Sequence, residues 1–122
     1  MNSNEIQEQQ KQTNQAVFIG IGEDITSQYL EVLEYCKHEN LPIVNMFVAQ
    51  EISDEQKLYQ IINEAMEFAA KDGVQNGNKT ALVFASKKNI PLFVNLTYIK
   101  EWILDDYTEL HIAKAHTKIS KN

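Results

Sequence analysis

The stretch AVFIGIGEDITSQYLEVLEYC, residues 16–36, decides the fold because it joins a strand pattern to a helix pattern. Residues 16–19 form a short, continuous apolar run, which is typical of a strand that is buried on both faces. Gly20 and Gly22 then mark a turn, and the apolar spacing that follows predicts a helix over about 27–39. A buried strand that turns into an amphipathic helix is the repeating unit of α/β proteins.

The predicted helix has both a cap and a buried face. Thr26 or Ser27 is expected to cap it, because a hydroxyl oxygen accepts the free N–H groups of a first turn. The apolar positions recur at helical spacing, and we expect the buried face to consist of Tyr29, Leu30, Leu33 and Cys36. The single cysteine is therefore expected to be a small core residue, and it excludes an internal disulfide.

The same alternation continues along the chain. Further strands are predicted over 41–48, 80–84 and 109–113, and further helices over about 53–69 and 90–104. The order βαβαβαβ predicts a three-layer α/β sandwich, in which helices cover both faces of a mostly parallel sheet. Residues 72–78 are polar and glycine-containing, so we expect a loop there. Residues 1–15 are polar and are expected to form a disordered tail before a domain over 16–122.

Composition and charge narrow the classes of function. The chain has 122 residues, enough for one domain, and all of its 11 basic residues are lysines. With a net charge of −6, DNA binding by this chain alone is not expected. The sequence shows no apolar stretch of the roughly 20 residues that a membrane span needs. The lone cysteine suits a reducing compartment, so we expect a cytoplasmic protein.

The glycine turn does not fit a phosphate-binding loop. A dinucleotide fingerprint would need a third glycine where Ile25 stands, and the Walker spacing and its lysine are absent. Glu23 and Asp24 would also repel a phosphate at the helix N-terminus. We therefore predict no nucleotide cofactor and no metal. An acidic pair at this place resembles the magnesium-binding pair of response-regulator receiver domains, but the third strand ends in Ala85-Ser86 without the aspartate that they need.

A longer stretch resembles the catalytic domain of serine recombinases, the resolvase and invertase family. The similarity covers about residues 16–120, and it rests on the order of elements and the apolar pattern. The features that resemble the family are Gln28, Glu34-Tyr35-Cys36 and Glu51-Ile52-Ser53, the segment KLYQIINEAM (57–66), the strand ALVFASKK (81–88) and the segment TELHIAKAHTKIS (108–120). The resemblance implies a resolvase-like α/β domain and a link to DNA recombination or mobile elements.

The departures from the family pattern bear on activity. Against the family's Tyr-x-Arg-x-Ser motif the chain has Phe18, Gly20 and Gly22, and its counterpart of Asp-Arg-x-x-Arg, residues 86–90, holds no arginine. Glycine provides no nucleophile, and the family's reaction needs cations on the phosphate oxygens. The sequence therefore predicts a catalytically inactive relative, which acts as a binding or assembly module with itself or a protein partner.

Two further sets of residues remain as alternatives. A divergent active recombinase would use Ser27 as nucleophile with Lys57 and Lys87, and it requires these three side chains to converge in one cleft. Binding roles at the same edge would fall to Gln28, Ser53 and Lys88. The three histidines are expected to be scattered, with His111 and His116 on opposite faces of a strand. Trp102, Tyr98 and Tyr107 are expected in the core or in an exposed aromatic patch.

Overall fold

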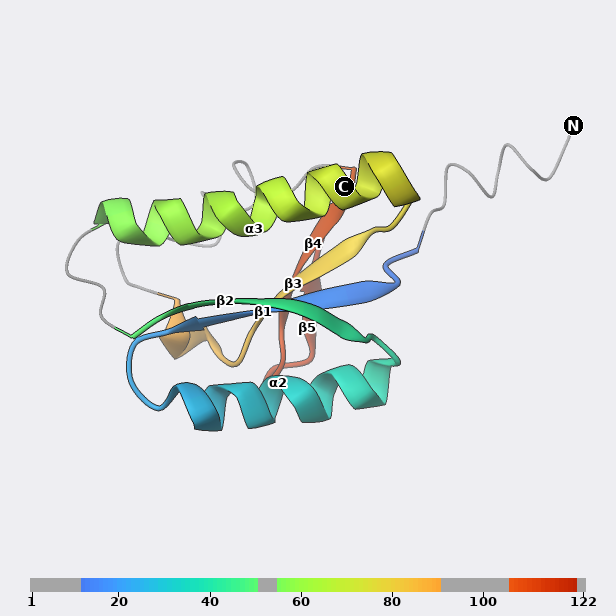
Figure 1. Cartoon of the computed structure of the whole chain (residues 1–122). Helices are drawn as coiled ribbons and strands as arrows, with labels where there is room; N and C mark the ends of the chain where they lie inside the picture. The colour runs from blue at the N-terminus through green and yellow to red at the C-terminus, as the bar shows by residue number, and fades with distance from the viewer. Residues whose placement is uncertain (1–11, 51–54, 91–105, 121–122) are drawn as a thin grey trace, which may run out of the picture.

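The computed structural model describes residues 12–50, 55–90 and 106–120 (Figure 1). The predicted third helix and its aromatic residues, and Ser53, lie outside these ranges, as does most of the predicted tail. The described elements, in chain order, are β1 (Gln15–Ile21), α2 (Ile25–Glu39), β2 (Ile43–Ala49), α3 (Glu55–Asn76), β3 (Thr80–Phe84), the 3₁₀ turn η1 (Lys87–Asn89), β4 (Thr108–Ile112) and β5 (Thr117–Ile119).

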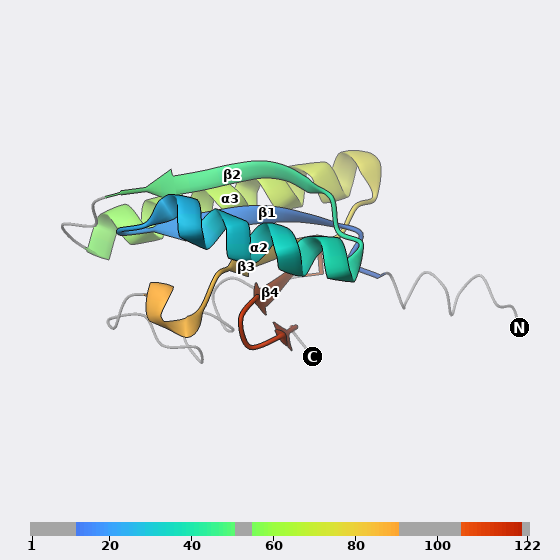
Figure 2. The ribbon, with the colours of Figure 1, turned by 90° about the horizontal axis from the view of Figure 1, so that it is seen from below.

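The strands form one five-stranded sheet in the order β2-β1-β3-β4-β5. The first four are parallel, and β5 turns back to pair antiparallel with β4. Helix α2 lies on one face of the sheet and α3 on the other, as Figures 1 and 2 show together. The predicted α/β fold with a mostly parallel sheet is therefore confirmed, and the end of the described chain adds an antiparallel edge strand.

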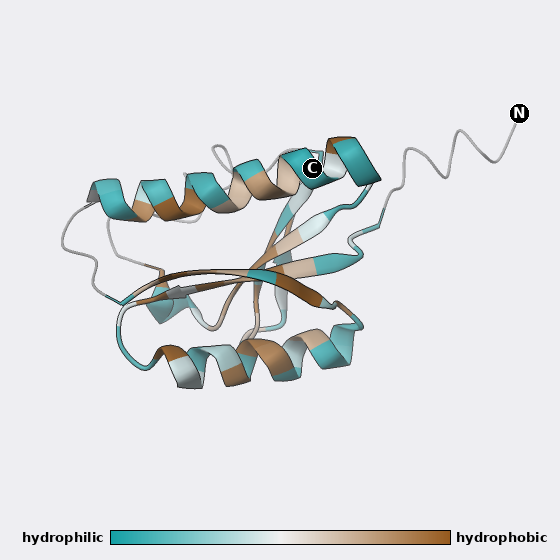
Figure 3. Cartoon of the chain, viewed as in Figure 1, coloured by the Kyte–Doolittle hydropathy of each residue, from teal (hydrophilic) through white to brown (hydrophobic). Residues whose placement is uncertain are grey.

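Strand β1 is buried along its whole length because it lies between two apolar layers. Val17 and Ile19 face the α3 side, whereas Phe18 faces the α2 side, as the alternation of a strand requires. Both helices contain apolar and polar residues (Figure 3), and the buried apolar ones, such as Val32 of α2 and Leu58 of α3, belong to the two cores of the sheet. The chain segment that decides the fold thus supplies side chains to both cores.

Helix α2 differs from its prediction at its start and on its buried face. It begins at Ile25, so Thr26 and Ser27 lie inside the first turn, and the N-cap position is Asp24, whose side chain makes no capping hydrogen bond. Leu30 is 57% exposed, which contradicts the expected face. The buried positions are instead Gln28, Val32, Tyr35 and Cys36. The polar Gln28 takes a place on the buried face, and this rotates the helix away from Leu30.

Helix α3 confirms its predicted apolar face but extends further than expected. Leu58 and Ile62 are fully buried, and the helix continues through residues 72–76, which were predicted to be a loop. Gly73 lies inside the helix, where an added Cβ would meet the ring of Tyr107. The glycine serves close packing inside the helix and does not end it. In the part of the chain that the structure describes, neither helix combines the length and the apolar composition that a membrane span needs.

Strand β1 starts one residue before the predicted domain boundary. Gln15, placed in the tail by its composition, is the first residue of β1 and is 7% exposed. Its amide nitrogen donates to Oδ2 of Asp72 at 2.6 Å and to the hydroxyl of Thr80 at 3.0 Å. The first bond links the start of β1 to the end of α3, and the second links it to the start of β3. Gln15 therefore belongs to the folded domain.

Candidate functional site

A small cavity lies at the carboxyl ends of β1 and β3. The chain runs from β1 to its neighbour β2 and then crosses to β3 on the other side of β1, and ligands of open α/β sheets bind outside such a switch point. The cavity has a volume of about 180 Å³, enough for a small polar group. We call it the switch-point cavity, and its lining residues are Glu23, Asp24, Ser27, Gln28, Glu31, Ala85, Ser86, Lys88, Asn89 and Lys114.

The two glycines beside this cavity are held in place by packing and by backbone conformation. A Cβ on Gly20 would lie 2.7 Å from Cζ of Phe18 and 3.3 Å from Cδ1 of Ile25. Gly22 has a φ of 88°, which side-chain-bearing residues rarely adopt, and its N–H donates to the carbonyl of Ala49 at 2.9 Å. The β1–α2 turn is therefore built for glycine at both positions.

Gln28 holds this turn together. Its Oε1 accepts from the N–H of Ile21 at 3.2 Å, and its Nε2 donates to the carbonyls of Ile21 and Glu23 at 2.9 and 2.8 Å. The amide thus pairs with the end of β1 much as a neighbouring strand would. Gln28 is 5% exposed, and both ends of its amide bond backbone groups. This residue was predicted to bind a ligand at this edge, and in the structure it also stabilises the turn.

The predicted catalytic trio is only partly represented at the cavity. Ser27 lines it together with Lys88 and Lys114, whereas Lys57 and Lys87 are not among its lining residues. Lys57 lies in the first turns of α3, on the other face of the sheet, and Lys87 is exposed in η1. Lys114 was not named as a candidate residue, although the parallel order of the predicted strands places the segment after residue 113 at this edge.

The charges around the cavity are mixed. Glu23, Asp24 and Glu31 supply three carboxylates, and Lys88 and Lys114 supply two ammonium groups. Ser86 Oγ donates to Oδ1 of Asn89 at 3.0 Å, which fits its predicted role as a turn residue. Ser27 lines the same cavity as these three carboxylates, and a nucleophilic role would require one of them to accept its proton.

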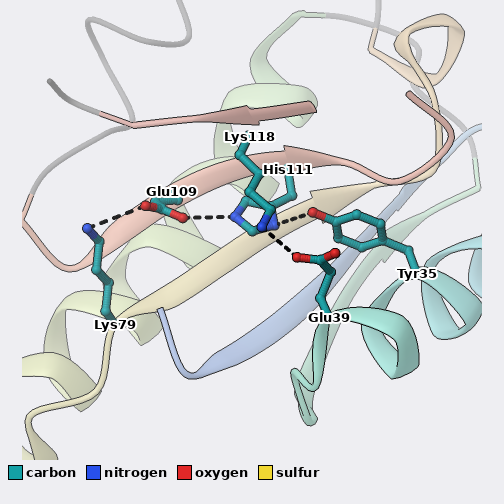
Figure 4. A network of polar contacts seen from close by, with 6 residues as sticks. All are labelled: Tyr35, Glu39, Lys79, Glu109, His111 and Lys118. Atoms are coloured by element: carbon teal, nitrogen blue, oxygen red, sulfur yellow. Dashed lines mark hydrogen bonds and ion pairs between the residues drawn. The ribbon is translucent and has the colours of Figure 1, made fainter. Parts of the chain in front are cut away.

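A second polar cluster is buried between α2 and β4 (Figure 4). The hydroxyl of Tyr35 lies 2.7 Å from Nδ1 of His111, whose Nε2 lies 2.9 Å from Oε1 of Glu109. Because the ionised Glu109 can only accept, His111 donates from Nε2 and accepts at Nδ1 from the tyrosine hydroxyl. Lys79 continues the chain with its Nζ 3.5 Å from Oε2 of Glu109. The cluster links the helix to the sheet through satisfied partners.

The electrostatics of this cluster indicate a structural role. Burial raises the pKa of Tyr35 well above its usual value of 10, so it remains a phenol rather than a nucleophilic phenolate. The hydrogen bond from His111 lowers the pKa of Glu109 from 4.5 to about 2, so this carboxylate stays ionised. Burial likewise raises the pKa of Cys36 to about 11, which confirms a buried core thiol and argues against a nucleophile.

The three histidines gather around Tyr35, contrary to the prediction that they are scattered. The ring centroids of His111 and His116 lie 5.8 and 5.5 Å from that of Tyr35, and His38 lies 5.8 Å from His116. The prediction placed His111 and His116 in one strand-like region. In the structure β4 ends at Ile112, and a hairpin turn brings His116 back to the α2 side. Within the described residues, no group of three such side chains is placed to hold a metal.

Comparisons of the chain with protein-family models, curated proteins and solved structures find no match. What the chain can do therefore follows from its own geometry. A small cavity of mixed charge lies at the switch point, and the buried tyrosine and cysteine described above are held neutral.

Proposed function

We propose that this chain is a catalytically inactive, resolvase-like domain that serves as a binding and assembly module. The observation that carries the proposal is the glycine turn between β1 and α2. By the resemblance, Gly20 and Gly22 stand where the family has an arginine and its nucleophilic serine. Their present surroundings suit glycine alone, because Phe18 fills the space at one position and a positive φ restricts the other.

The charges support a protein partner over DNA. The chain carries a net charge of −6, and three carboxylates beside two lysines at the switch-point cavity would oppose a polyanion. A link to DNA recombination or mobile elements would then run through a partner that holds the DNA. The cavity offers both carboxylates and ammonium groups. It therefore suits an amine and a carboxylate that are presented together by the side chains of a docked protein.

A strand-cleavage assay tests the absence of catalysis. We expect no nicking of supercoiled DNA and no covalent protein–DNA adduct from the full chain. The alternative, a divergent recombinase, is favoured only by the fact that Ser27, Lys88 and Lys114 line the same cavity. An adduct that is lost in Ser27→Ala and kept in Thr26→Ala, the neighbouring exposed hydroxyl, would overturn the proposal and support that alternative.

A receiver-like regulator is the weaker alternative. It is favoured by one observation, which is that Glu23, Asp24 and Lys114 line the same cavity. A magnesium titration followed by NMR tests it, and we expect the amides of residues 22–25 to keep their chemical shifts. Saturable shifts there that vanish in Asp24→Asn, with Glu34→Gln as the control on the same helix, would favour the receiver-like function instead.

A further inference from the structure

The carboxylate of Asp72 gathers three hydrogen bonds near the end of α3. Its Oδ1 accepts from Nδ2 of Asn76 at 2.6 Å, and its Oδ2 accepts from Nδ2 of Asn78 at 2.7 Å and from Nε2 of Gln15 at 2.6 Å. The bonds from Asn78, Asn76 and Gln15 lower the pKa of Asp72, so it remains an ionised acceptor. We call these four residues the Asp72 hub.

The Asp72 hub joins three parts of the fold. Gln15 is the first residue of β1, Asn76 is the last residue of α3, and Asn78 lies in the connection to β3. Gln15 also donates to the hydroxyl of Thr80, the first residue of β3, at 3.0 Å. A chemical change at one member of the hub would therefore act on the helix and on the starts of both central strands.

One member of the hub belongs to a chemically reactive pair. Asn76 is followed by Gly77, and this is the single Asn-Gly pair in the sequence. The backbone nitrogen of the following residue can attack the side-chain amide carbon of an asparagine, and glycine hinders this attack least because it has no Cβ. Both residues are exposed, and Gly77 has a φ of 74°, the conformation with which glycine ends a helix. The pair therefore lies at a helix end that is open to water.

We propose that Asn76 is a site of spontaneous deamidation, and that the reaction converts the Asp72 hub from a clamp into a pair of facing carboxylates. The backbone nitrogen of Gly77 loses its proton and forms a bond to Cγ of Asn76. The side-chain nitrogen takes up a proton and leaves as ammonia, so that a cyclic imide remains. Water then opens the imide to aspartate or isoaspartate. One water enters and one ammonia leaves, so the step needs no other reactant.

The folded contacts determine when the reaction occurs. The N–H of Gly77 donates to the carbonyl of Gly73 at 2.9 Å, and Nδ2 of Asn76 is held by Asp72. The attack requires both bonds to open, which happens when the last turn of α3 unwinds. Helix ends open more readily than the core, and Gly73 weakens this turn further because glycine is a poor helix former. The rate of deamidation therefore follows the opening of this turn.

The product opposes closure of the turn. A carboxylate at position 76 removes one donor from Asp72 and places a like charge beside its Oδ1. It also adds a negative charge at the carboxyl end of a helix, where the helix dipole disfavours it. The end of α3 would then stay open, and the bonds from Gln15 and Asn78 to Asp72 would weaken. Deamidation thus acts as a one-way loosening of this end of the sheet.

Peptide mass spectrometry on the full chain, incubated at body temperature in mildly alkaline buffer, tests the reaction. We expect conversion at Asn76, faster in urea than in the folded chain, while Asn78 of the same hub keeps its amide. Gly77→Ala should slow the reaction at least tenfold in urea, where the comparison does not depend on folding. A folded chain that keeps the amide of Asn76, or one that loses the amide of Asn78 equally fast, would overturn the proposal.

NMR on Asn76→Asp, which carries the carboxylate of one product, tests the effect on the hub. We expect the side-chain NH₂ signals of Gln15 and Asn78 to shift, and the amide of Gly77 to exchange at least tenfold faster. The matched control is Gln75→Glu, which adds the same charge at an exposed neighbouring position of α3 and should leave these signals and this exchange rate unchanged. Unshifted signals in Asn76→Asp, or equal shifts in the control, would overturn the loosening.

Discussion

The two faces of the sheet are packed in different ways. The α3 face is filled by large aliphatic side chains, including Leu58, Ile62 and Leu82. The α2 face uses small residues, such as Ala81 and Ala113, and also buries the polar contact between Tyr35 and His111. Buried apolar side chains stabilise the α3 face in proportion to the area that they remove from water. Close approach and directional hydrogen bonds on the α2 face fix how the helix sits.

The largest effect is expected on the α3 face. Leu58→Ala should lower the free energy of unfolding by about 2–5 kcal/mol, because it removes a fully buried side chain and leaves a cavity. The matched control is Leu30→Ala on α2, where the side chain is 57% exposed and the change should stay within about 0.5 kcal/mol. Urea denaturation measures both, and equal losses would contradict the contrast between the faces.

Overpacking should be the main sensitivity of the α2 face. Gly20→Ala is expected to cost about 1–3 kcal/mol, because its methyl group would meet the ring of Phe18. The ring cannot move freely, since it packs edge-on against Tyr29 with centroids 5.4 Å apart. Adding Phe18→Leu should make part of the cost of Gly20→Ala disappear. Additive losses in the double variant would show that the ring is not the obstacle.

The polar contact of the α2 face should contribute a similar amount. Tyr35→Phe keeps the ring but leaves Nδ1 of His111 buried without its donor, which costs about 1–3 kcal/mol. Tyr29→Phe is the control, because Tyr29 is half-buried on the same helix and outside this cluster. Thermal unfolding at neutral pH measures the difference between the two variants, and a loss equal to that of the control would argue against the contact.

The smallest effect is a dependence on pH. The pKa of Glu109 is about 2 in the folded chain against an ordinary 4.5, so the unfolded chain binds more protons between these values. Its stabilisation is therefore complete above about pH 4.5 and is lost as the pH falls towards 2. Glu109→Gln should flatten this part of the profile of unfolding free energy. A profile parallel to that of the unchanged chain would contradict it.

The central strands β1 and β3 were predictable from sequence because burial on both faces makes them continuous apolar runs. Residues 80–84 match β3 residue for residue, and the order of the elements followed from the alternation. The turn details were not predictable, since they depend on tertiary contacts. Gln28 folds back on the end of β1, and the hairpin after β4 carries His116 to Tyr35. Neither contact leaves a periodic signal in the chain.

The same limit applies to the candidate site. Ser27 and Lys88 were identified from their position after predicted strands, and both line the switch-point cavity. The parallel order placed the segment after residue 113 at the same edge, but nothing in the sequence singled out Lys114 within it. The interpretation of Gly20 and Gly22 as lost functional positions remains a prediction. The structure adds that Phe18 leaves little room for a side chain at Gly20 and that the positive φ of Gly22 favours glycine.

The contact between Gly73 and Tyr107 has a consequence for the order in which the chain folds. The last turns of α3 pack against a residue that a ribosome makes only after all of α3 and β3. A glycine inside a helix weakens it by about 1 kcal/mol relative to alanine, so these turns are poorly stable until that residue arrives. At the same end of the helix, Asp72 can already bond Gln15 of β1 before Tyr107 is made, so only the packing at Gly73 has to wait for the later part of the chain.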